Sequence, residues 1–324
     1  MNIVCATDNN FVQHCGVMLV SLLKNNSKDV VIYLLTEGLT QNNVNLLNEI
    51  VTLNGGTLHV VIVNSSVLKD CPMPSSSNLS HISIATYYRL LIPKLLPNVV
   101  EKVIYLDCDI VIRHSIQELW ETALDDNAIG AVAQIVEWNI LAIKRLNYPL
   151  KFGYFNAGVL LINLNYWRKN NITEKLFEYL IKKHDVIKYH DQDALNGVLY
   201  DKSTKISIKW NMLTGFFMKK TLKVNDYDNG IIINNYSDYK DQLLKEKDDP
   251  TIVHFVSTPK PWDVGCTHPF KNDYYYYLQF TPWKDFKLPY LISYIFKRPT
   301  IVYRILKNRL KQLLLGNPYF KINK

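Results

Sequence analysis

Two carboxylates follow an apolar run near the middle of the chain. Residues 103–106 lead into Asp107 and Asp109, with Cys108 between them. If the run is a β-strand, side chains two residues apart point to the same side, so the two carboxylates face the same space. Two like charges that close repel each other unless a cation lies between them. Carboxylate oxygens suit Mg²⁺ or Mn²⁺, which often also bind substrate phosphates, so the segment predicts a metal–diphosphate site.

The elements that precede this segment alternate between two hydrophobic periods. Strand-like runs cover residues 3–7, 30–35 and 57–63, and helical spacing covers residues 11–24 and 42–51. This β-α-β-α-β order predicts an α/β fold with a doubly wound, mostly parallel sheet and helices on both faces. Ligands of such sheets bind beyond the carboxyl ends of the strands. Asp8 and Asn10 follow the first strand, so they and the Asp107–Asp109 pair are expected at one crevice.

The second half of the chain continues the alternation less regularly. Residues 71–80 predict a loop, and helical spacing returns at 83–91, before the strand that carries the two aspartates. Further strands are expected at 129–133 and 157–163, and helices at 164–183 and 191–199. Residues 201–250 are polar and predict Asn- and Asp-rich loops, whereas residues 251–263 again have an ordered pattern.

Charge divides the 324 residues into a neutral body and a basic tail. The net charge is +8, yet residues 286–324 contain nine Lys or Arg and no Asp or Glu. Residues 1–285 are therefore expected to form one domain, and residues 286–324 a separate basic C-terminal tail. A basic tail binds anionic surfaces, such as lipid headgroups. No nucleic-acid-binding motif accompanies it, so nucleic acid is not an expected partner.

Within the tail, residues 300–315 have the spacing of an amphipathic helix. One face is apolar (Val302, Leu306, Leu310, Leu313) and the opposite face is basic (Arg304, Lys307, Lys311). This pattern predicts a helix that lies in a membrane interface with its basic side toward anionic lipid. The alternative is a helix that docks on the body and exposes its basic face to water.

Cysteine usage and the N-terminus bear on localisation. The five cysteines form no C-x-x-C pair, which favours a reducing compartment over a disulfide framework. The first residues have no basic region before an apolar run, so they do not predict a secretory signal. We therefore expect a cytoplasmic protein, held at the cytoplasmic face of the inner membrane by its tail.

The Asp-x-Asp segment alone also fits other classes of protein. Haloacid-dehalogenase-type phosphohydrolases use a similar strand end, but they need a later Gly-Asp pair, and none of the twelve glycines here precedes an Asp. A sugar-nucleotide-binding protein without catalysis is a further alternative. Acidic pairs at strand ends are also often only solvated loop starts.

Five segments together resemble one enzyme family. They are residues 6–10 (ATDNN), the Asp-x-Asp pair, residues 155–163 (FNAGVLLIN), residues 190–197 (HDQDALNG) and residues 254–262 (HFVSTPKPW). In this order they resemble glycosyltransferase family 8, which has the GT-A fold and includes bacterial lipooligosaccharide galactosyltransferases and glycogenin. The resemblance covers about residues 1–285. It implies a retaining enzyme that transfers galactose or glucose from a UDP-sugar to a saccharide hydroxyl of a cell-surface glycan or glycolipid, such as lipopolysaccharide core.

The resemblance also implies roles for individual residues. Asp107, Asp109 and His254 would bind Mn²⁺, with Mg²⁺ as a possible substitute, because imidazole with carboxylates suits Mn²⁺ somewhat better. Taken alone, His254 has the alternative of a hydrogen-bonded core histidine. The further residues implied at the donor are Ala6, Thr7, Asp8, Asn10, Arg89, Cys108, Asn156, Ser257 and Lys260. Asp8 has the alternative of an ordinary Asx turn after a strand.

Asn156, Asp191 and Gln192 match positions around the transferred hexose, and Asp193 follows them as a further catalytic candidate. Asp191 would hold sugar hydroxyls, Gln192 would lie at the β-face of the anomeric carbon, and Asp193 is a candidate nucleophile. Asp191 and Asp193 could instead cap their helix. An amide is a poor nucleophile, so we expect front-face attack with Gln192 as a stabiliser, and double displacement through a carboxylate stays open.

Two residues depart from the family pattern. Gln134 stands where the lipooligosaccharide galactosyltransferases have an Asp near the acceptor, and Ser257 replaces a glycine next to the diphosphate. The first change leaves the acceptor open, and the second is compatible with donor binding.

Overall fold

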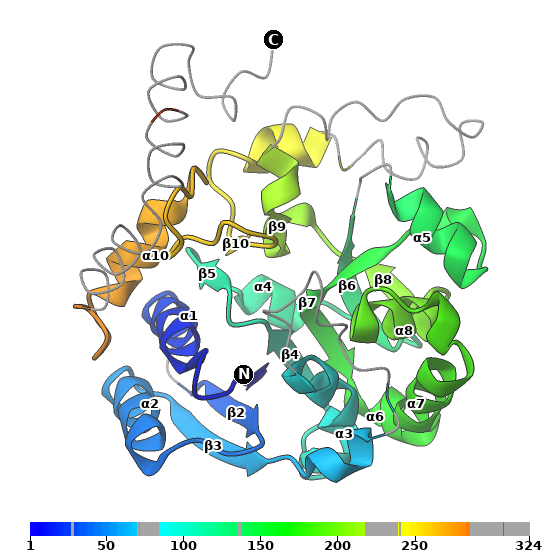
Figure 1. Ribbon diagram of the computed structural model, residues 1–324, viewed down its shortest axis with the longest axis horizontal. Coiled ribbons are helices and arrows are strands. Elements are labelled where there is room, and N and C mark those ends of the chain that lie inside the picture. The colour runs from blue at the N-terminus through cyan, green and yellow to red at the C-terminus, as the bar shows by residue number, and fades with distance from the viewer. Residues whose placement is uncertain are drawn as a thin grey trace.

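The fold is built on two sheets. The computed structural model describes residues 1–26, 29–69, 71, 84–134, 138–217, 239, 241–285 and 307. The large sheet has the strand order β3-β2-β1-β4-β7-β6-β8, and the small one has the order β5-β10-β9. Figure 1 shows the small sheet above the middle of the large one. The strands are β1 (Asn2–Ala6), β2 (Val31–Thr36), β3 (Thr57–Ile62), β4 (Lys102–Leu106), β5 (Ile110–Ile112), β6 (Ile129–Ala133), β7 (Phe155–Asn163), β8 (Ser203–Lys205), β9 (Met212–Leu213) and β10 (Ile252–His254).

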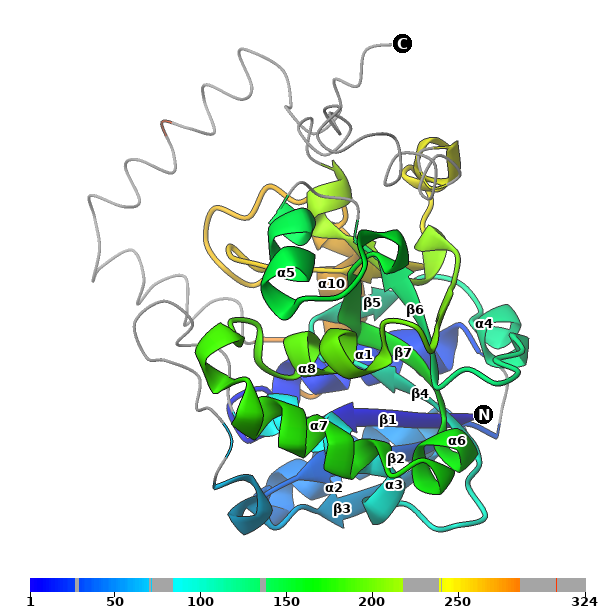
Figure 2. The ribbon, with the colours of Figure 1, turned by 90° about the vertical axis from the view of Figure 1, so that its right-hand side faces the viewer.

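Helices cover both faces of the large sheet. In Figure 2, α7 and α8 lie in front of the sheet, and α1 and α2 lie behind it. The main helices are α1 (Val12–Lys24), α2 (Gln41–Leu53), α3 (Ile92–Leu95), α4 (Gln117–Glu121), α5 (Trp138–Leu146), α6 (Leu164–Lys169), α7 (Ile172–Lys182), α8 (His190–Leu199) and α10 (Lys271–Leu278). A 3₁₀ helix, η2 (Ile84–Leu91), precedes α3. This confirms the expected α/β fold with helices on both faces.

The central strands β1, β4, β7 and β6 of the large sheet are buried on both sides, because they contribute alternate side chains to two cores. Ile3 and Cys5 of β1 pack into the core on the α1 and α2 side, whereas Val4 packs into the core on the α6, α7 and α8 side. The same alternation recurs in β7, where Val159 faces the first core and Leu160 the second. Such near-continuous apolar strands are typical of a sheet that helices cover twice.

Strand direction follows the prediction in one half of the sheet. The strands β3, β2, β1 and β4 run parallel to one another, but β7 is antiparallel to both of its neighbours, β4 and β6. The chain moves from β1 to β2 on one side and reaches β4 on the other side. The boundary between β1 and β4 is therefore the switch point at which open α/β sheets bind ligands.

Several local predictions need correction. The helix expected at residues 164–183 is divided into α6 and α7, because Asn171 adopts a left-handed conformation with φ of 51°. Asn tolerates this conformation better than most residues, so it ends one helix and begins the next. The helical segment expected at 83–91 is a 3₁₀ helix. The region 201–250 contains β8, β9 and a helical turn at 241–246, where only loops were expected.

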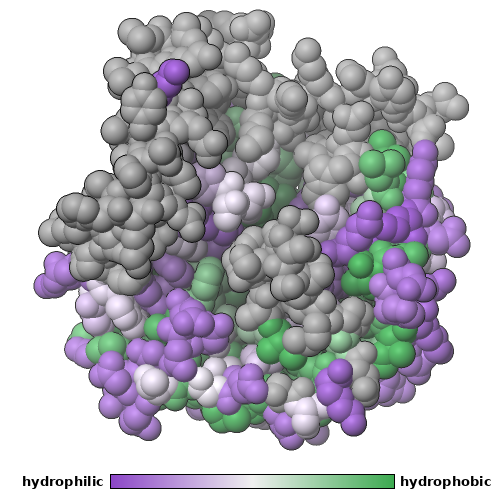
Figure 3. Space-filling model, in the orientation of Figure 1, coloured by the Kyte–Doolittle hydropathy of each residue, from purple (hydrophilic) through white to green (hydrophobic). Residues whose placement is uncertain are grey.

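Two predicted segments lie mostly outside the described residues. Of the loop at 71–80 only Cys71 is described, and of the tail helix only Lys307, which is helical and exposed. Among the described residues, no helix combines the length and apolarity needed to cross a bilayer. On the face shown in Figure 3, hydrophilic side chains cover α2 and the lower edge, and hydrophobic ones form small separate areas.

Candidate active site

Three potential metal ligands from distant parts of the chain meet where the two sheets join. Asp107 and Asp109 lie in the turn between β4 and β5, and His254 ends β10. Since β10 pairs antiparallel with β5, with His254 opposite Ile110, the imidazole lies beside the aspartates. Its Nε2 is 3.1 Å from Asp109 Oδ1 and 3.8 Å from Asp107 Oδ2. One ligand atom from each residue lies within 4.8 Å of the other two, which is the spacing that a shared cation requires.

A glycine makes room for this cluster. Gly158 of β7 accepts a hydrogen bond at its carbonyl from the Asp107 backbone N–H, with an N···O distance of 2.8 Å. A Cβ at this position would come within 2.2 Å of His254 Cε1 and 2.6 Å of Asp107 Oδ2. Any larger residue would displace both ligands. The position therefore supports a built metal site, and the two carboxylates and one imidazole beside it fit a divalent cation.

We expect the substitution Gly158→Ala to weaken Mn²⁺ binding by about 100-fold, because the added methyl group would overlap with both His254 and Asp107 and must displace them. The affinity can be measured from the electron paramagnetic resonance signal of free Mn²⁺. Gly38→Ala is the matched control, since a Cβ there would meet no atom within 4 Å. Equal affinities in the two variants would contradict the role of Gly158.

A buried arginine connects the metal cluster to a second carboxylate. The Arg89 guanidinium bonds Asp107 Oδ1 at 2.8 Å and Asp191 Oδ2 at 3.0 Å, and it lies 4.3 Å from the centre of the Tyr105 ring. The hydroxyl of Thr86 donates to Asp191 Oδ1. Burial raises the pKa of Asp191 above its ordinary value, and the charge of Arg89 opposes that rise. Arg89 thus compensates the buried carboxylate of Asp191 and the partly exposed carboxylate of Asp107.

The other aspartate of the pair has its own cation. Lys260 Nζ lies 2.5 Å from Asp109 Oδ2 and donates also to the carbonyl of Phe255. Burial of Asp109 disfavours its charge, but the charge of Lys260 opposes this effect, and the pKa of Asp109 lies well below its ordinary value. The carboxylate therefore stays charged, as a metal ligand must be.

These residues line a cleft of about 280 Å³. Of the residues predicted for the donor, the lining includes Ala6, Thr7, Asp8, Arg89, Asp107, Cys108, Asp109, Asn156, His254, Ser257 and Lys260. Asn10 is exposed and outside this lining. Asp8 Oδ1 accepts from the backbone N–H groups of Asn10 and Phe11, so Asp8 forms the Asx turn as well as lining the cleft.

Sequence reasoning missed Phe11, whose ring lines the same cleft. The ring lies edge-on to His14, at 4.8 Å between ring centres, and to Trp262, at 5.8 Å. An aromatic face held in this way suits the flat face of a nucleobase. The available signal was its position, because Phe11 follows the polar residues at the end of the first strand.

Ser257 occupies a backbone position that favours glycine. Its φ is 67°, in the left-handed region that few residues with a side chain adopt. This agrees with the family pattern, in which a glycine stands there. The serine retains the loop conformation at an energetic cost of about 1 kcal/mol.

The hexose positions predicted for α8 are only partly oriented toward the cleft. Gln192 contacts the cleft residue Asn156, since its Oε1 accepts from Asn156 Nδ2 at 3.0 Å. Asp191 is buried against Arg89 and Thr86 and does not belong to the lining.

Asp193 is enclosed. Its carboxylate, which is 0% exposed, pairs with Arg145 and accepts from the hydroxyl of Tyr154 and from the backbone N–H groups of Lys188 and Tyr189. These donors occupy its lone pairs, which is the arrangement expected of the capping alternative and leaves little room for Asp193 to act as the candidate nucleophile.

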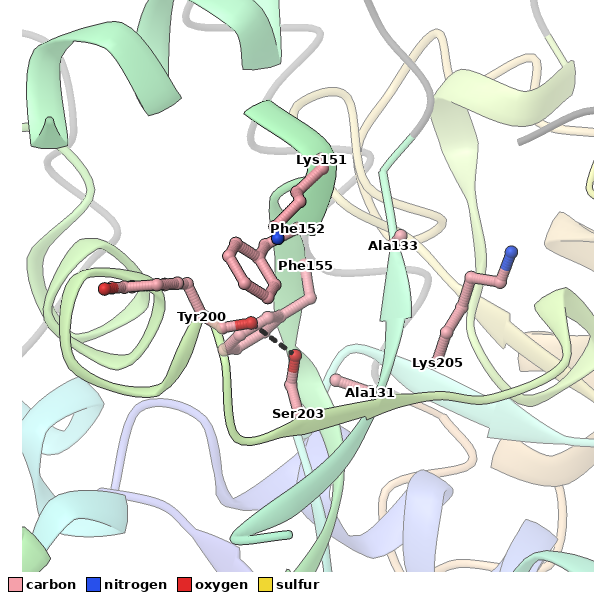
Figure 4. A pocket seen from close by; sticks show the side chains of 8 residues that line it. All are labelled: Ala131, Ala133, Lys151, Phe152, Phe155, Tyr200, Ser203 and Lys205. Atoms are coloured by element: carbon pink, nitrogen blue, oxygen red, sulfur yellow. Dashed lines mark hydrogen bonds between the residues drawn. The ribbon is translucent and has the colours of Figure 1, made fainter. Parts of the chain in front are cut away.

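Gln134 lies apart from the cleft. It follows β6, is 8% exposed, and accepts at its backbone carbonyl from Asn139 Nδ2. A second cavity, of about 270 Å³, lies near it, between β6, β8 and the segment 151–155. Figure 4 shows its aromatic rings, Phe152 and Phe155, facing the cavity, while Lys205 points away from them. Among the described residues that line it there is no carboxylate or histidine, in contrast to the first cleft.

Comparison with known proteins agrees with this arrangement. The chain matches the family described as Glycosyl transferase family 8 over residues 2–265. It is 32% identical to general stress protein A of Bacillus subtilis, over 89% of this chain and 96% of that protein. It is 29% identical to a lipopolysaccharide 1,3-galactosyltransferase of Salmonella typhimurium, over 87% of this chain and 79% of that protein.

Among solved structures, the galactosyltransferase LgtC in complex with donor and acceptor sugar analogs is similar throughout. It aligns with a TM-score of 0.76 and 26% identity, over 88% of this chain and 99% of LgtC. The fold of this chain is therefore the GT-A fold. Together, the match over residues 2–265 and the structural likeness show that the chain belongs to glycosyltransferase family 8.

Proposed function

We propose that this protein is a retaining hexosyltransferase that moves galactose or glucose from a UDP-sugar to a saccharide hydroxyl. The observation that carries the proposal is the convergence of Asp107, Asp109 and His254 in one cleft. Membership of the family and the likeness to a lipopolysaccharide galactosyltransferase and to LgtC support a hexosyl donor and a saccharide acceptor.

Different residues of the cleft would hold different parts of the donor. Phe11 and the residues from Ala6 to Asp8 would hold the uridine, at the end of β1. Asp107, Asp109 and His254 would hold Mn²⁺, and Lys260 would lie beside the diphosphate. When bound, the cation supplies Lewis-acid stabilisation of the negative charge that develops on the diphosphate.

In the reaction, the bond between the anomeric carbon and the diphosphate oxygen breaks, and its electron pair leaves with UDP. The acceptor oxygen forms a new bond to the same face of that carbon and passes its proton to the departing diphosphate oxygen, which lies on that face. Gln192 would stabilise the developing positive charge through its Oε1, which the Asn156 amide and the Ala157 backbone N–H hold in place. We favour this front-face route over double displacement, because Asp193 is enclosed by its own hydrogen bonds.

The proposed acceptor is a growing cell-surface glycan or glycolipid, such as lipopolysaccharide core. Gln134 is the residue proposed near it, at the end of β6. An amide there can both donate to and accept from a sugar hydroxyl, whereas a carboxylate only accepts. The acceptor is therefore expected to differ in at least one hydroxyl contact from that of enzymes with an Asp at this position.

The test is a donor screen with UDP-glucose, UDP-galactose and their N-acetyl forms, followed by UDP release, with Mn²⁺ or with excess chelator. We expect release from one hexose donor, only with the metal. Equal calorimetric binding of UDP with Mn²⁺ and with chelator would overturn the metal site. Phosphate release without UDP dependence would support a phosphohydrolase activity. Binding of a UDP-sugar without turnover would support a non-catalytic protein.

The tail is proposed to hold the enzyme at the cytoplasmic face of an anionic membrane. We expect deletion of residues 296–324 to leave activity on a soluble acceptor largely unchanged, because the cleft is formed by residues 6–260. The deletion removes eight of the nine tail cations, each of which contributes about 1 kcal/mol near an anionic surface. Co-sedimentation with phosphatidylglycerol vesicles should therefore be lost. Unchanged sedimentation would contradict the membrane role.

A further inference from the structure

A chain of buried amides connects the metal-binding histidine to the hexose side of the cleft. His254 Nδ1 lies 2.9 Å from Asn211 Oδ1, and Asn211 Nδ2 donates to Asn156 Oδ1 at 2.8 Å. Asn156 Nδ2 in turn donates to Gln192 Oε1 at 3.0 Å. Exposure is 2% for His254, 0% for Asn211 and 7% for Asn156, so water can replace few of these bonds.

The backbone fixes the direction of every bond in this chain. The N–H of Gly158 donates to Asn156 at 2.9 Å, so the atom that faces it must be the amide oxygen. The N–H of Ala157 donates to Gln192 at 3.1 Å and fixes that amide in the same way. A backbone N–H can only donate, so neither amide can turn over without losing a buried bond.

The directions of these hydrogen bonds also determine which ring nitrogen of His254 carries a proton. Because Asn156 presents its oxygen, Asn211 must present its NH₂ group to it, and the Asn211 oxygen is left for His254. An oxygen beside Nδ1 requires a proton on Nδ1. The other ring nitrogen, Nε2, then offers its lone pair toward Asp107 and Asp109. A metal-binding imidazole needs this arrangement.

We propose that Asn211 is a positioning residue that fixes which nitrogen of His254 carries the proton and which one binds the cation. The inference rests on the proposed metal site and assigns a role to a residue outside the cleft lining. The same amide chain orients Gln192, so the metal side and the hexose side of the cleft are set by shared bonds.

The test compares two variants of the full-length protein by their affinity for Mn²⁺ alone. Asn211→Leu keeps the branching at Cγ but offers no acceptor, and we expect a 10- to 100-fold weaker affinity, the effect of losing such a supporting bond. Asn211→Asp keeps an oxygen for Nδ1–H and should bind Mn²⁺ within about threefold of the unmodified protein. Asn25→Leu, which removes bonds to Ser21, Ile112 and Tyr277 but none to the metal ligands or to the amide chain, should leave the affinity unchanged.

A spectroscopic measurement separates positioning from packing. In protein with ¹⁵N-labelled histidine and diamagnetic Mg²⁺, we expect a slowly exchanging proton on His254 Nδ1, which Asn211→Leu should lose. A folded Leu variant that binds Mn²⁺ within about threefold and retains this proton would overturn the inference. If the Leu variant does not fold, a tenfold loss of affinity in folded Asn211→Asp would overturn it. Failure of the unmodified protein to bind Mn²⁺ would instead overturn the proposed metal site, and the inference with it.

Discussion

Replacing Asp109 by Asn is expected to lower kcat for UDP-sugar turnover by about 10³-fold, while the protein stays folded. The substitution keeps the shape of the side chain but removes the negative charge that faces both His254 and Lys260. An amide oxygen is a far weaker ligand for a divalent cation than a carboxylate. Stabilisation of the departing diphosphate is worth several kcal/mol, so its loss lowers the rate by orders of magnitude.

The measurement is steady-state UDP release over a range of Mn²⁺ concentrations. Asp185→Asn is the matched control, because that side chain is 84% exposed and distant in sequence from the cluster. The control should retain full activity. If excess Mn²⁺ restored normal kcat to Asp109→Asn, Asp109 would contribute to the affinity for Mn²⁺, but its negative charge would not be needed for turnover. Normal activity at low Mn²⁺ would contradict the metal site.

Local patterns in the sequence predicted the strands of this site well. The apolar run before Asp107 and the two-residue spacing to Asp109 were enough to place both carboxylates at a strand end. The first strands and helices alternate cleanly, so the hydrophobic periods alone predicted the parallel half of the sheet. His254 was different, since a lone histidine after a short strand has no such pattern. Its role came from the family resemblance.

The parts that sequence could not predict depend on pairing between distant strands. No feature of the sequence around Gly158 indicates that the absence of a side chain there makes room for His254. That contact arises because β7 runs antiparallel to β4, while β10 pairs with β5. The predicted strand at 157–163 carried no information on its direction. Asn211 lies next to β9, a strand of two residues that is too short for a periodic signal.

The largest expected loss of stability follows from Arg89→Met. The methionine can fill much of the space, but it leaves the carboxylates of Asp107 and Asp191 without their shared cation. Removing one partner of a buried ion pair typically costs 3–5 kcal/mol, so we expect the free energy of unfolding to fall by about that amount at pH 7.5. Arg113→Met is the matched control. Arg113 also pairs with two aspartates, but one of them is 67% exposed, so the expected loss is below about 1 kcal/mol.

The pH dependence tests whether an uncompensated carboxylate causes this loss. Burial already raises the pKa of Asp191 in the folded protein, and removal of Arg89 should raise it further. A carboxyl whose pKa is higher in the folded state than in the unfolded state favours folding at low pH, and this contribution is lost as pH rises through the folded-state pKa. The loss of unfolding free energy in Arg89→Met should therefore become smaller as the pH falls from 7.5 to 5 in urea titrations.

Adding Asp191→Asn should restore part of the stability at pH 7.5, because it removes one buried charge that has no partner. A deficit that is constant across this range, with no recovery in the double variant, would mean that Arg89 stabilises the fold through packing on Tyr105 and not through its charge.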